Sequence, residues 1–218
     1  MRELEELRPD VVVFGGDLAA GALPRETIAL ARSVPNARFV RGNCEREMLE
    51  GPHTGPLTGW AAEQIDDADR AFLRSFDFTL VVDGALYCHA TPYDDMSFVT
   101  VLTPDDVARE TIGEVSQSTV VVGHTHTQFD RKLGDLRLVN AGSVGMPYED
   151  RPGAYWALVR DGEPELRRTD YDLGEAADRI RPTEWPIAEE WVEDNLLTVP
   201  SARDTAEFFE QQRAQPRV

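Results

Sequence analysis

Short apolar runs recur along the chain, and each ends in a cluster of glycine, asparagine or histidine. β-Branched and aromatic side chains dominate these runs, which predict strands at residues 11–14, 38–40, 85–88, 119–122 and 136–139. Two further strands, at residues 155–159 and 166–170, flank an Asp-Gly turn and predict a hairpin. Helical stretches lie between the strands, at residues 24–33, 67–76 and 104–115. This alternation predicts an α/β fold.

The last part of the chain has a different pattern. From Gly174 onward, the sequence indicates two or three acidic amphipathic helices, whose apolar anchors are Trp185, Trp191, Leu196, Phe208 and Phe209. No Gly/Ser-rich linker or repeat separates them from the rest. We therefore expect residues 174–218 to form an appended layer on the domain made by residues 1–173, with residues 211–218 frayed.

The charge balance excludes one class of partner. The chain has 22 basic and 40 acidic residues, a net charge of −18, which argues against non-specific binding of nucleic acid. A small phosphorylated molecule is still possible if a metal ion holds its phosphate. The apolar runs are far shorter than the roughly 18 residues of a membrane span, the start of the chain does not resemble a secretory signal, and two cysteines make no disulfide scaffold. We expect a cytoplasmic protein.

Candidate metal ligands follow the predicted strands. Three of the four histidines, His89, His124 and His126, come directly after strands, and Asp17 and Asn43 follow two others. Because ligands gather at the carboxyl ends of strands in open α/β sheets, we expect these side chains to converge. Imidazole, carboxylate and amide oxygen suit Mn, Fe, Zn, Ni or Mg.

Each residue alone has an ordinary structural explanation. Asp17 could cap the next helix, Asn43 could belong to a turn, and His89 could be a hydrogen-bonded core histidine. His124 and His126 are harder to explain in this way, because they stand two residues apart in a chain with few histidines. The combination favours a metal site.

The order of the motifs resembles that of a known family. The motifs are Gly-Gly-Asp (15–17), Gly-Asn-Cys-Glu (42–45), His-Ala-Thr-Pro (89–92), Gly-His-Thr-His (123–126) and Asn-Ala-Gly-Ser-Val-Gly (140–145). The series resembles the calcineurin-like metallophosphoesterases, and looks closest to their small bacterial and archaeal phosphodiesterase branch. The resemblance implies a four-layer α/β/β/α sandwich.

The resemblance also implies a site with two divalent ions, most simply Mn. By this likeness, Asp17 bridges both ions, Asn43, His89 and His124 bind the second, and His126 binds the first. A hydroxide that bridges the ions would attack phosphorus in line with the leaving oxygen.

The chain departs from the family pattern at its front. Family members begin with a strand ending in Asp-x-His, whereas residues 1–9 here resemble the last turns of a helix. By comparison with the family, we expect the first strand and its catalytic loop to be missing, which leaves the first metal site incomplete and the activity weak or absent. Cys44 stands where many relatives carry histidine, and no histidine adjoins it in sequence to activate its thiol.

Two functions remain open at this point. The favoured one is a phosphoesterase, a phosphodiesterase or phosphatase acting on a small phosphate ester; the alternative is a non-catalytic interaction scaffold on the same fold, similar to the retromer subunit. A homo-oligomer is possible. Substrate selection is expected in the loops at residues 51–60, which include His53, and 93–103.

Overall fold

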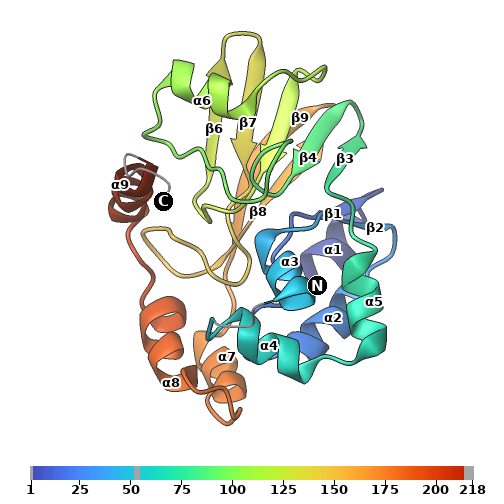
Figure 1. The fold of residues 1–218 in the computed structure, drawn as a ribbon, viewed down its shortest axis with the longest axis vertical. Coiled ribbons are helices and arrows are strands. Elements are labelled where there is room, and N and C mark those ends of the chain that lie inside the picture. Colours follow the sequence, from blue (N-terminus) through green and yellow to red (C-terminus); the bar gives the residue numbers. More distant parts are fainter. Residues whose placement is uncertain (1, 52–54, 214–218) are drawn as a thin grey trace.

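The computed structural model describes residues 2–51 and 55–213 (Figure 1). The helices are α1 (Arg2–Leu7), α2 (Pro24–Arg32), α3 (Asn43–Glu50), α4 (Thr58–Gln64), α5 (Asp67–Arg74), α6 (Asp105–Ile112), α7 (Leu173–Ile180), α8 (Ala188–Trp191), the π-helix η1 (Val192–Leu197) and α9 (Ala202–Arg213). The strands are β1 (Val12–Phe14), β2 (Ala37–Phe39), β3 (Thr79–Val82), β4 (Ala85–Cys88), β5 (Thr119–Val122), β6 (Phe129–Leu133), β7 (Leu136–Asn140), β8 (Ala154–Arg160) and β9 (Glu163–Thr169). The mixed α/β fold that the sequence predicts is confirmed.

The strands of the described residues form three sheets. A five-stranded sheet has the order β3-β4-β5-β7-β6, in which β4, β5 and β7 are parallel. Strands β1 and β2 form a parallel pair, and β8 and β9 form the predicted hairpin. Because β4 and β5 are parallel neighbours, the residues that follow them meet at one edge of the sheet.

Two apolar clusters lie on either side of this edge. In one cluster, α6 packs on the five-stranded sheet and buries Ala108 and Ile112 against Val120 and Leu138. In the other, helices α2 to α5 enclose a cluster that includes Ile28, Met48, Ala61 and Leu73, with Phe39 of β2 at its border. This edge of the sheet therefore lies between two halves of the molecule, each packed around its own apolar cluster (Figure 1).

Gln128 joins the five-stranded sheet to the hairpin. This residue precedes β6, and its side-chain Nε2 donates to the carbonyl of Trp156 in β8 at 2.9 Å and to that of Arg167 in β9 at 3.0 Å. The same group lies 3.0 Å from the carbonyl of Ala141. The loops that follow β5 and β7 are therefore fastened to the hairpin.

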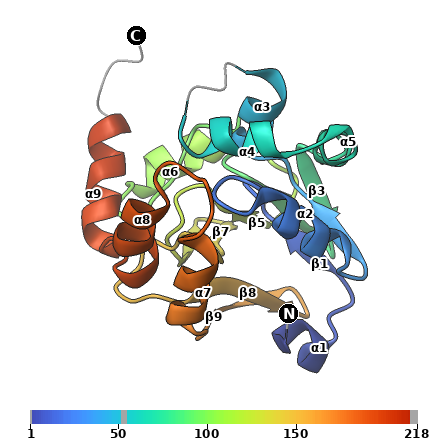
Figure 2. The same cartoon turned by 90° about the horizontal axis from the view of Figure 1, so that it is seen from below.

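The C-terminal helices contact the rest of the chain at several places. Trp185 donates its indole N–H to the carbonyl of Pro56 at 2.7 Å, and Glu210 of α9 accepts a hydrogen bond from Thr100 at 2.7 Å. Figure 2 shows α8 and α9 on the same flank of the molecule. The expectation of fraying is wrong for residues 211–213, which continue α9, while residues 214–218 lie outside the described part.

Two further observations concern the sequence predictions. Residues 51–60 were expected to form a loop, but α4 already begins at Thr58. His53 lies outside the described residues. Among the residues that the structure describes, no helix is long and apolar enough to cross a membrane.

Candidate metal centre

Asp17 lies just beyond the end of β1, in a turn that needs glycine nearby. Its backbone is left-handed, with φ of 57°, and its Oδ1 accepts the backbone N–H of Cys44 at 2.9 Å. A Cβ at Gly42 would lie 2.2 Å from Asp17 Oδ1, so only glycine allows this approach. The Gly-Gly-Asp and Gly-Asn-Cys-Glu motifs are thus packed directly against each other.

His89 follows β4 immediately and is 3% exposed. Its Nδ1 lies 2.8 Å from the carbonyl oxygen of Gly15, an acceptor, so Nδ1 carries a proton and Nε2 faces the other candidate ligands. A Cβ at Gly16, where φ is 96°, would lie 2.6 Å from Nδ1. The glycines before Asp17 therefore also make room for His89.

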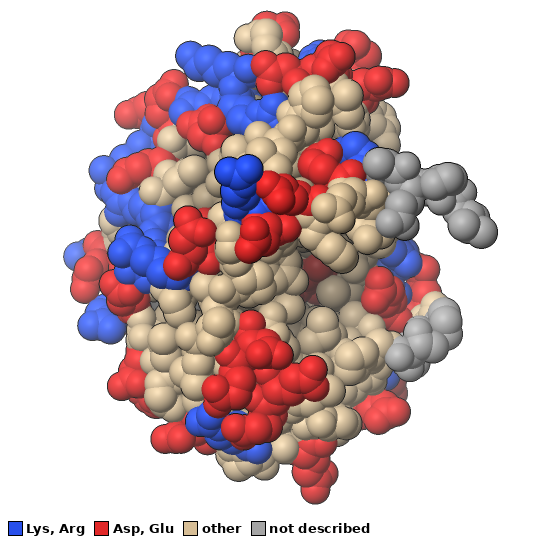
Figure 3. All heavy atoms as spheres, turned by 90° about the vertical axis from the view of Figure 1, so that its left-hand side faces the viewer, with Lys and Arg blue, Asp and Glu red and all other residues tan. Residues whose placement is uncertain are grey.

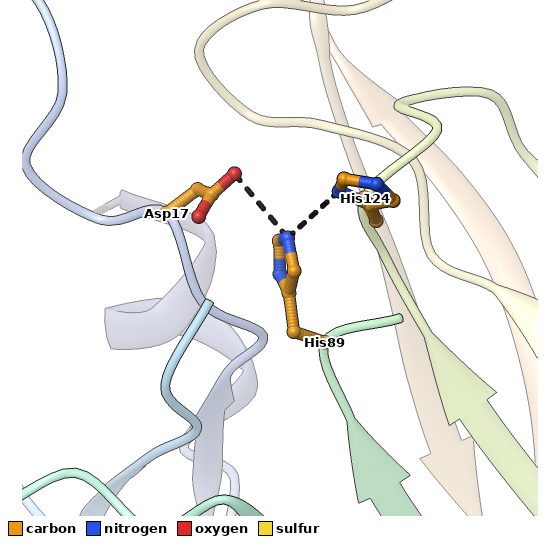
Figure 4. Close-up of side chains that lie close together, drawn as sticks. All are labelled: Asp17, His89 and His124. Atoms are coloured by element: carbon orange, nitrogen blue, oxygen red, sulfur yellow. Dashed lines mark hydrogen bonds and ion pairs between the residues drawn. The ribbon is translucent and has the colours of Figure 1, made fainter. Parts of the chain in front are cut away.

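Three possible metal-binding atoms surround His89 Nε2. Figure 4 shows Asp17 and His124 on either side of this ring, with Asp17 Oδ2 at 3.2 Å and His124 Nδ1 at 3.1 Å. Asn43 Oδ1 is also at 3.2 Å. One nitrogen carries at most one proton, which cannot satisfy three neighbours at once. An ion bound at about 2.0–2.2 Å places adjacent ligand atoms roughly 3.0–3.5 Å apart, so the spacing fits ligands of one cation.

The five residues selected from the sequence do not all lie equally close together. One ligand atom each from Asp17, His89 and His124 lies within 4.8 Å of the others, and Asn43, the first residue of α3, adjoins them through His89. His126 is not part of this group among the described residues. Asp17, His89, His124 and Asn43 therefore form one cluster, and His126 stands beside it.

His126 is held by a separate set of contacts. Its Nδ1 lies 2.7 Å from the carbonyl oxygen of Met146, and its ring stacks on Tyr148 with centroids 5.0 Å apart and an angle of 25° between the planes. Its φ is 57°, and that of His124 is 61°. Left-handed backbone is uncommon outside glycine and often marks functional loops.

Burial and charge together set the protonation of the cluster. Burial raises the pKa of Asp17, but the neighbouring charge of His89, its hydrogen bond and the Cys44 N–H outweigh burial and hold the pKa below its usual value. Burial lowers the pKa of His89, and the Asp17 carboxylate reverses this effect, so the net shift is upward. Burial and the charge of His89 lower the pKa of His124 to about 4. The cluster therefore offers a carboxylate and, in His124, a neutral imidazole at neutral pH.

Glu45 is a site residue that the sequence analysis quoted only within a motif. Its side chain is fully buried, and it accepts the backbone N–H groups of Asp17 at 2.8 Å, Leu18 at 2.7 Å and Gly42 at 2.8 Å. Burial and the charge of Asp17 raise the pKa of Glu45, whereas these three bonds favour its carboxylate. Glu45 thus joins the two turns that carry Asp17 and Asn43.

The thiol of Cys44 does not provide a nucleophile. Burial and the charges of Asp17 and Glu45 raise its pKa far above the usual range, so the reactive thiolate is disfavoured. Cys44 contributes its backbone N–H to Asp17 instead.

Comparisons with known proteins identify the family and the fold of the chain. A family model described as the calcineurin-like phosphoesterase superfamily domain matches residues 1–161. A metallophosphoesterase from Sphaerobacter thermophilus has a similar structure, with a TM-score of 0.68, 18% identity, and 83% of this chain and 87% of that chain covered. A hypothetical protein from Pyrococcus horikoshii superposes with a TM-score of 0.75 at 18% identity, covering 92% of this chain and 90% of that one. No curated protein matches.

Proposed function

Because the chain belongs to the calcineurin-like phosphoesterase superfamily, we propose that it is a metal-dependent hydrolase of small phosphate esters. The crowding around His89 Nε2 is the observation that supports this proposal most directly. Three atoms that can bind a metal, one each from Asp17, Asn43 and His124, lie 3.1–3.2 Å from it. Carboxylate, amide oxygen and imidazole form a ligand set suited to divalent ions such as Mn.

Divalent ions at this cluster would supply Lewis acidity, which activates water and neutralises charge on the phosphoryl oxygens. The chain's own residues prepare the place for this chemistry. Asp17 supplies an anionic oxygen held by the Cys44 N–H, and the Gly15 carbonyl orients His89 so that Nε2 faces Asp17. In a chain with a net charge of −18, bound cations are also the simplest means of attracting a phosphate.

The proposal extends to two ions, with Asp17 shared between them. His126 supports a second position, because it stands beside the cluster and interacts electrostatically with Asp17. Its Nδ1 donates to the Met146 carbonyl, which leaves the Nε2 lone pair available to bind a metal ion. We further propose a cytoplasmic location, consistent with the free thiols of Cys44 and Cys88.

Metal binding and hydrolysis by the full chain test this function. The purified protein should bind Mn after dialysis, as measured by elemental analysis, and should hydrolyse bis(p-nitrophenyl) phosphate only when Mn is present. Asp17→Asn should lose both properties. Asp130→Asn alters a carboxylate on β6 that pairs with Arg137 of β7, and this variant should keep them.

The same experiment separates the enzyme from the scaffold alternative. A binding platform has no need for a metal cluster, so protein that binds no Mn and hydrolyses neither diesters nor monoesters would favour the scaffold. If Asp17→Asn and Asp130→Asn reduce metal binding equally, the metal does not bind at the Asp17 cluster.

A further inference from the structure

A hollow of about 330 Å³ lies beside the candidate metal centre, on the flank formed by the C-terminal helices. Its lining comes from the loop after β7, from η1 and from α9, and consists of Tyr148, Asn195, Pro200, Asp204, Thr205, Phe208 and Phe209. Figure 3 looks onto this flank and shows that its surface is hollowed. The volume is at the lower end of the range for small-molecule pockets, about 300–1,000 Å³.

Tyr148 connects this hollow to the metal centre. Its ring lines the hollow and stacks on the ring of His126, with centroids 5.0 Å apart. Phe209 lies 6.5 Å from the Tyr148 ring at an angle of 45°. The Tyr148 side chain therefore lies between the hollow and His126, which stands beside the cluster.

Helix α9 presents two aromatic rings to the hollow and is anchored outside it. Glu210 accepts a hydrogen bond from Thr100, Arg213 bonds to the carbonyl of Phe98, and Phe209 packs on the Phe98 ring at 5.1 Å. Phe208 also lines the hollow, yet 56% of its surface remains exposed. The ring contact of Phe208 with Phe209, with centroids 6.0 Å apart, lies within α9 itself.

We infer that this hollow is a subsite for an apolar, flat group, such as an aryl ring, carried by the ester whose phosphate binds at the metal centre. The inference rests on the proposed function and adds the substrate class. Aromatic walls favour stacking with a ring. The one charged side chain of the lining, Asp204, disfavours a second anionic group there, so the phosphate is directed to the cluster and the apolar end to the hollow.

Two substrates with the same leaving group test this subsite. Methyl p-nitrophenyl phosphate and 2-naphthyl p-nitrophenyl phosphate both release p-nitrophenolate and differ only in the group that the hollow would hold. Phe208→Ala removes one wall, and Thr205→Trp fills the space. Val81→Ala is the control, because Val81 on β3 is 56% exposed, as Phe208 is, and does not line this hollow.

Both hollow variants should lower kcat/KM for the naphthyl ester by about tenfold and leave the methyl ester within about twofold, because they change a contact made only by the larger group. Val81→Ala should change neither ester. Equal losses on the two esters, or unchanged kcat/KM for both in the two hollow variants, would overturn the inference. If Thr205→Trp lowers the melting temperature strongly, the kcat/KM values of Phe208→Ala for the two esters are the test of the inference.

Binding without catalysis gives a second readout. Saturation-transfer NMR with 2-naphthol, which has no phosphate, measures occupancy of the hollow in metal-free protein. Wild type and Val81→Ala should bind 2-naphthol and Thr205→Trp should not. If naphthol binding is lost in Thr205→Trp but no ester is hydrolysed, the proposed function fails and the aromatic subsite stands. If both esters are hydrolysed equally well and naphthol does not bind, the subsite is wrong and the hydrolase stands.

Discussion

The carboxylate of Glu45 accepts the backbone N–H of Asp17 at 2.8 Å, from a position 28 residues further along the chain. The other oxygen accepts the N–H of Leu18 at 2.7 Å. Because this buried carboxylate holds the backbone on both sides of the Asp17 side chain, it fixes the direction in which that side chain points. A residue outside the proposed ligand set thus determines where the proposed ligand Asp17 lies.

Glu45→Gln should therefore weaken metal binding as well as stability. The amide keeps the size of the side chain but replaces one acceptor oxygen with a donor that faces backbone N–H groups. We expect a loss of about 2 kcal/mol in the free energy of unfolding and a loss of about tenfold in Mn affinity. Urea unfolding and isothermal titration calorimetry measure the two effects. Glu163→Gln, whose side chain is 77% exposed, is the control and should change neither.

Gly42→Ala should disrupt the site through a single methyl group. The added Cβ would lie 2.2 Å from Asp17 Oδ1, so the carboxylate must leave its present position beside His89. We expect Mn affinity to fall by about tenfold or more, as for loss of a neighbour that orients a ligand. Gly15→Ala is the matched control, since its Cβ would meet nothing within 4 Å. Equal affinity of the two variants for Mn would show that Asp17 tolerates displacement.

Metal binding should release a proton from His89. Burial lowers the pKa of this ring, but the Asp17 carboxylate outweighs burial and raises the pKa above its ordinary value, so metal-free protein holds more proton on His89 at pH 6.5 than a free imidazole does. An imidazole nitrogen must be deprotonated to bind a metal, so binding at Nε2 displaces the proton. Calorimetric titration with Mn in buffers of different ionisation enthalpy should show this release at pH 6.5, and it should diminish at higher pH. Enthalpies independent of the buffer would contradict the protonated state.

Acid should destabilise the metal-free protein through His124. Burial and the charge of His89 lower its pKa from 6.5 to about 4, so the unfolded chain binds a proton more readily than the folded one between these values. Stability from this group is complete above pH 6.5 and is lost as the pH falls toward 4. At 1.36 kcal/mol per pKa unit, the loss is up to about 3 kcal/mol. Urea unfolding at pH 7 and pH 4.5 should show a smaller difference for His124→Asn than for wild type.

Local patterns predicted most of the apolar strands, but β3 (Thr79–Val82) was missed although its side chains are largely apolar. The predicted ranges of β4 and β5 coincide with the observed strands, and the hairpin turns at Asp161–Gly162 as expected. Strand β6 was missed, because its segment Phe129–Leu133 has charged residues at three central positions and buries only its two ends. Helix α3 was missed because its first residue, Asn43, follows a glycine and indicated a turn.

The cluster was predictable because its ligands follow strands, but its surroundings were not. His89 and His124 were expected to converge from their places after β4 and β5, and their nitrogens lie 3.1 Å apart. Glu45 and Tyr148 gave no such signal. Their roles depend on contacts with Asp17 and His126 across separate turns, and no spacing in the sequence encodes those contacts.

The separation of the cluster residues along the chain has a consequence for folding. The bond between Gly15 and His89 spans 74 residues and that between Asn43 and His89 spans 46, whereas the β8–β9 hairpin closes over a two-residue turn. Contacts between distant residues form slowly, because long loops must close first. During synthesis, the hairpin can form as soon as its own residues have emerged. The cluster must wait until the distant segments that carry it have come together, so the proposed metal would be acquired late in folding.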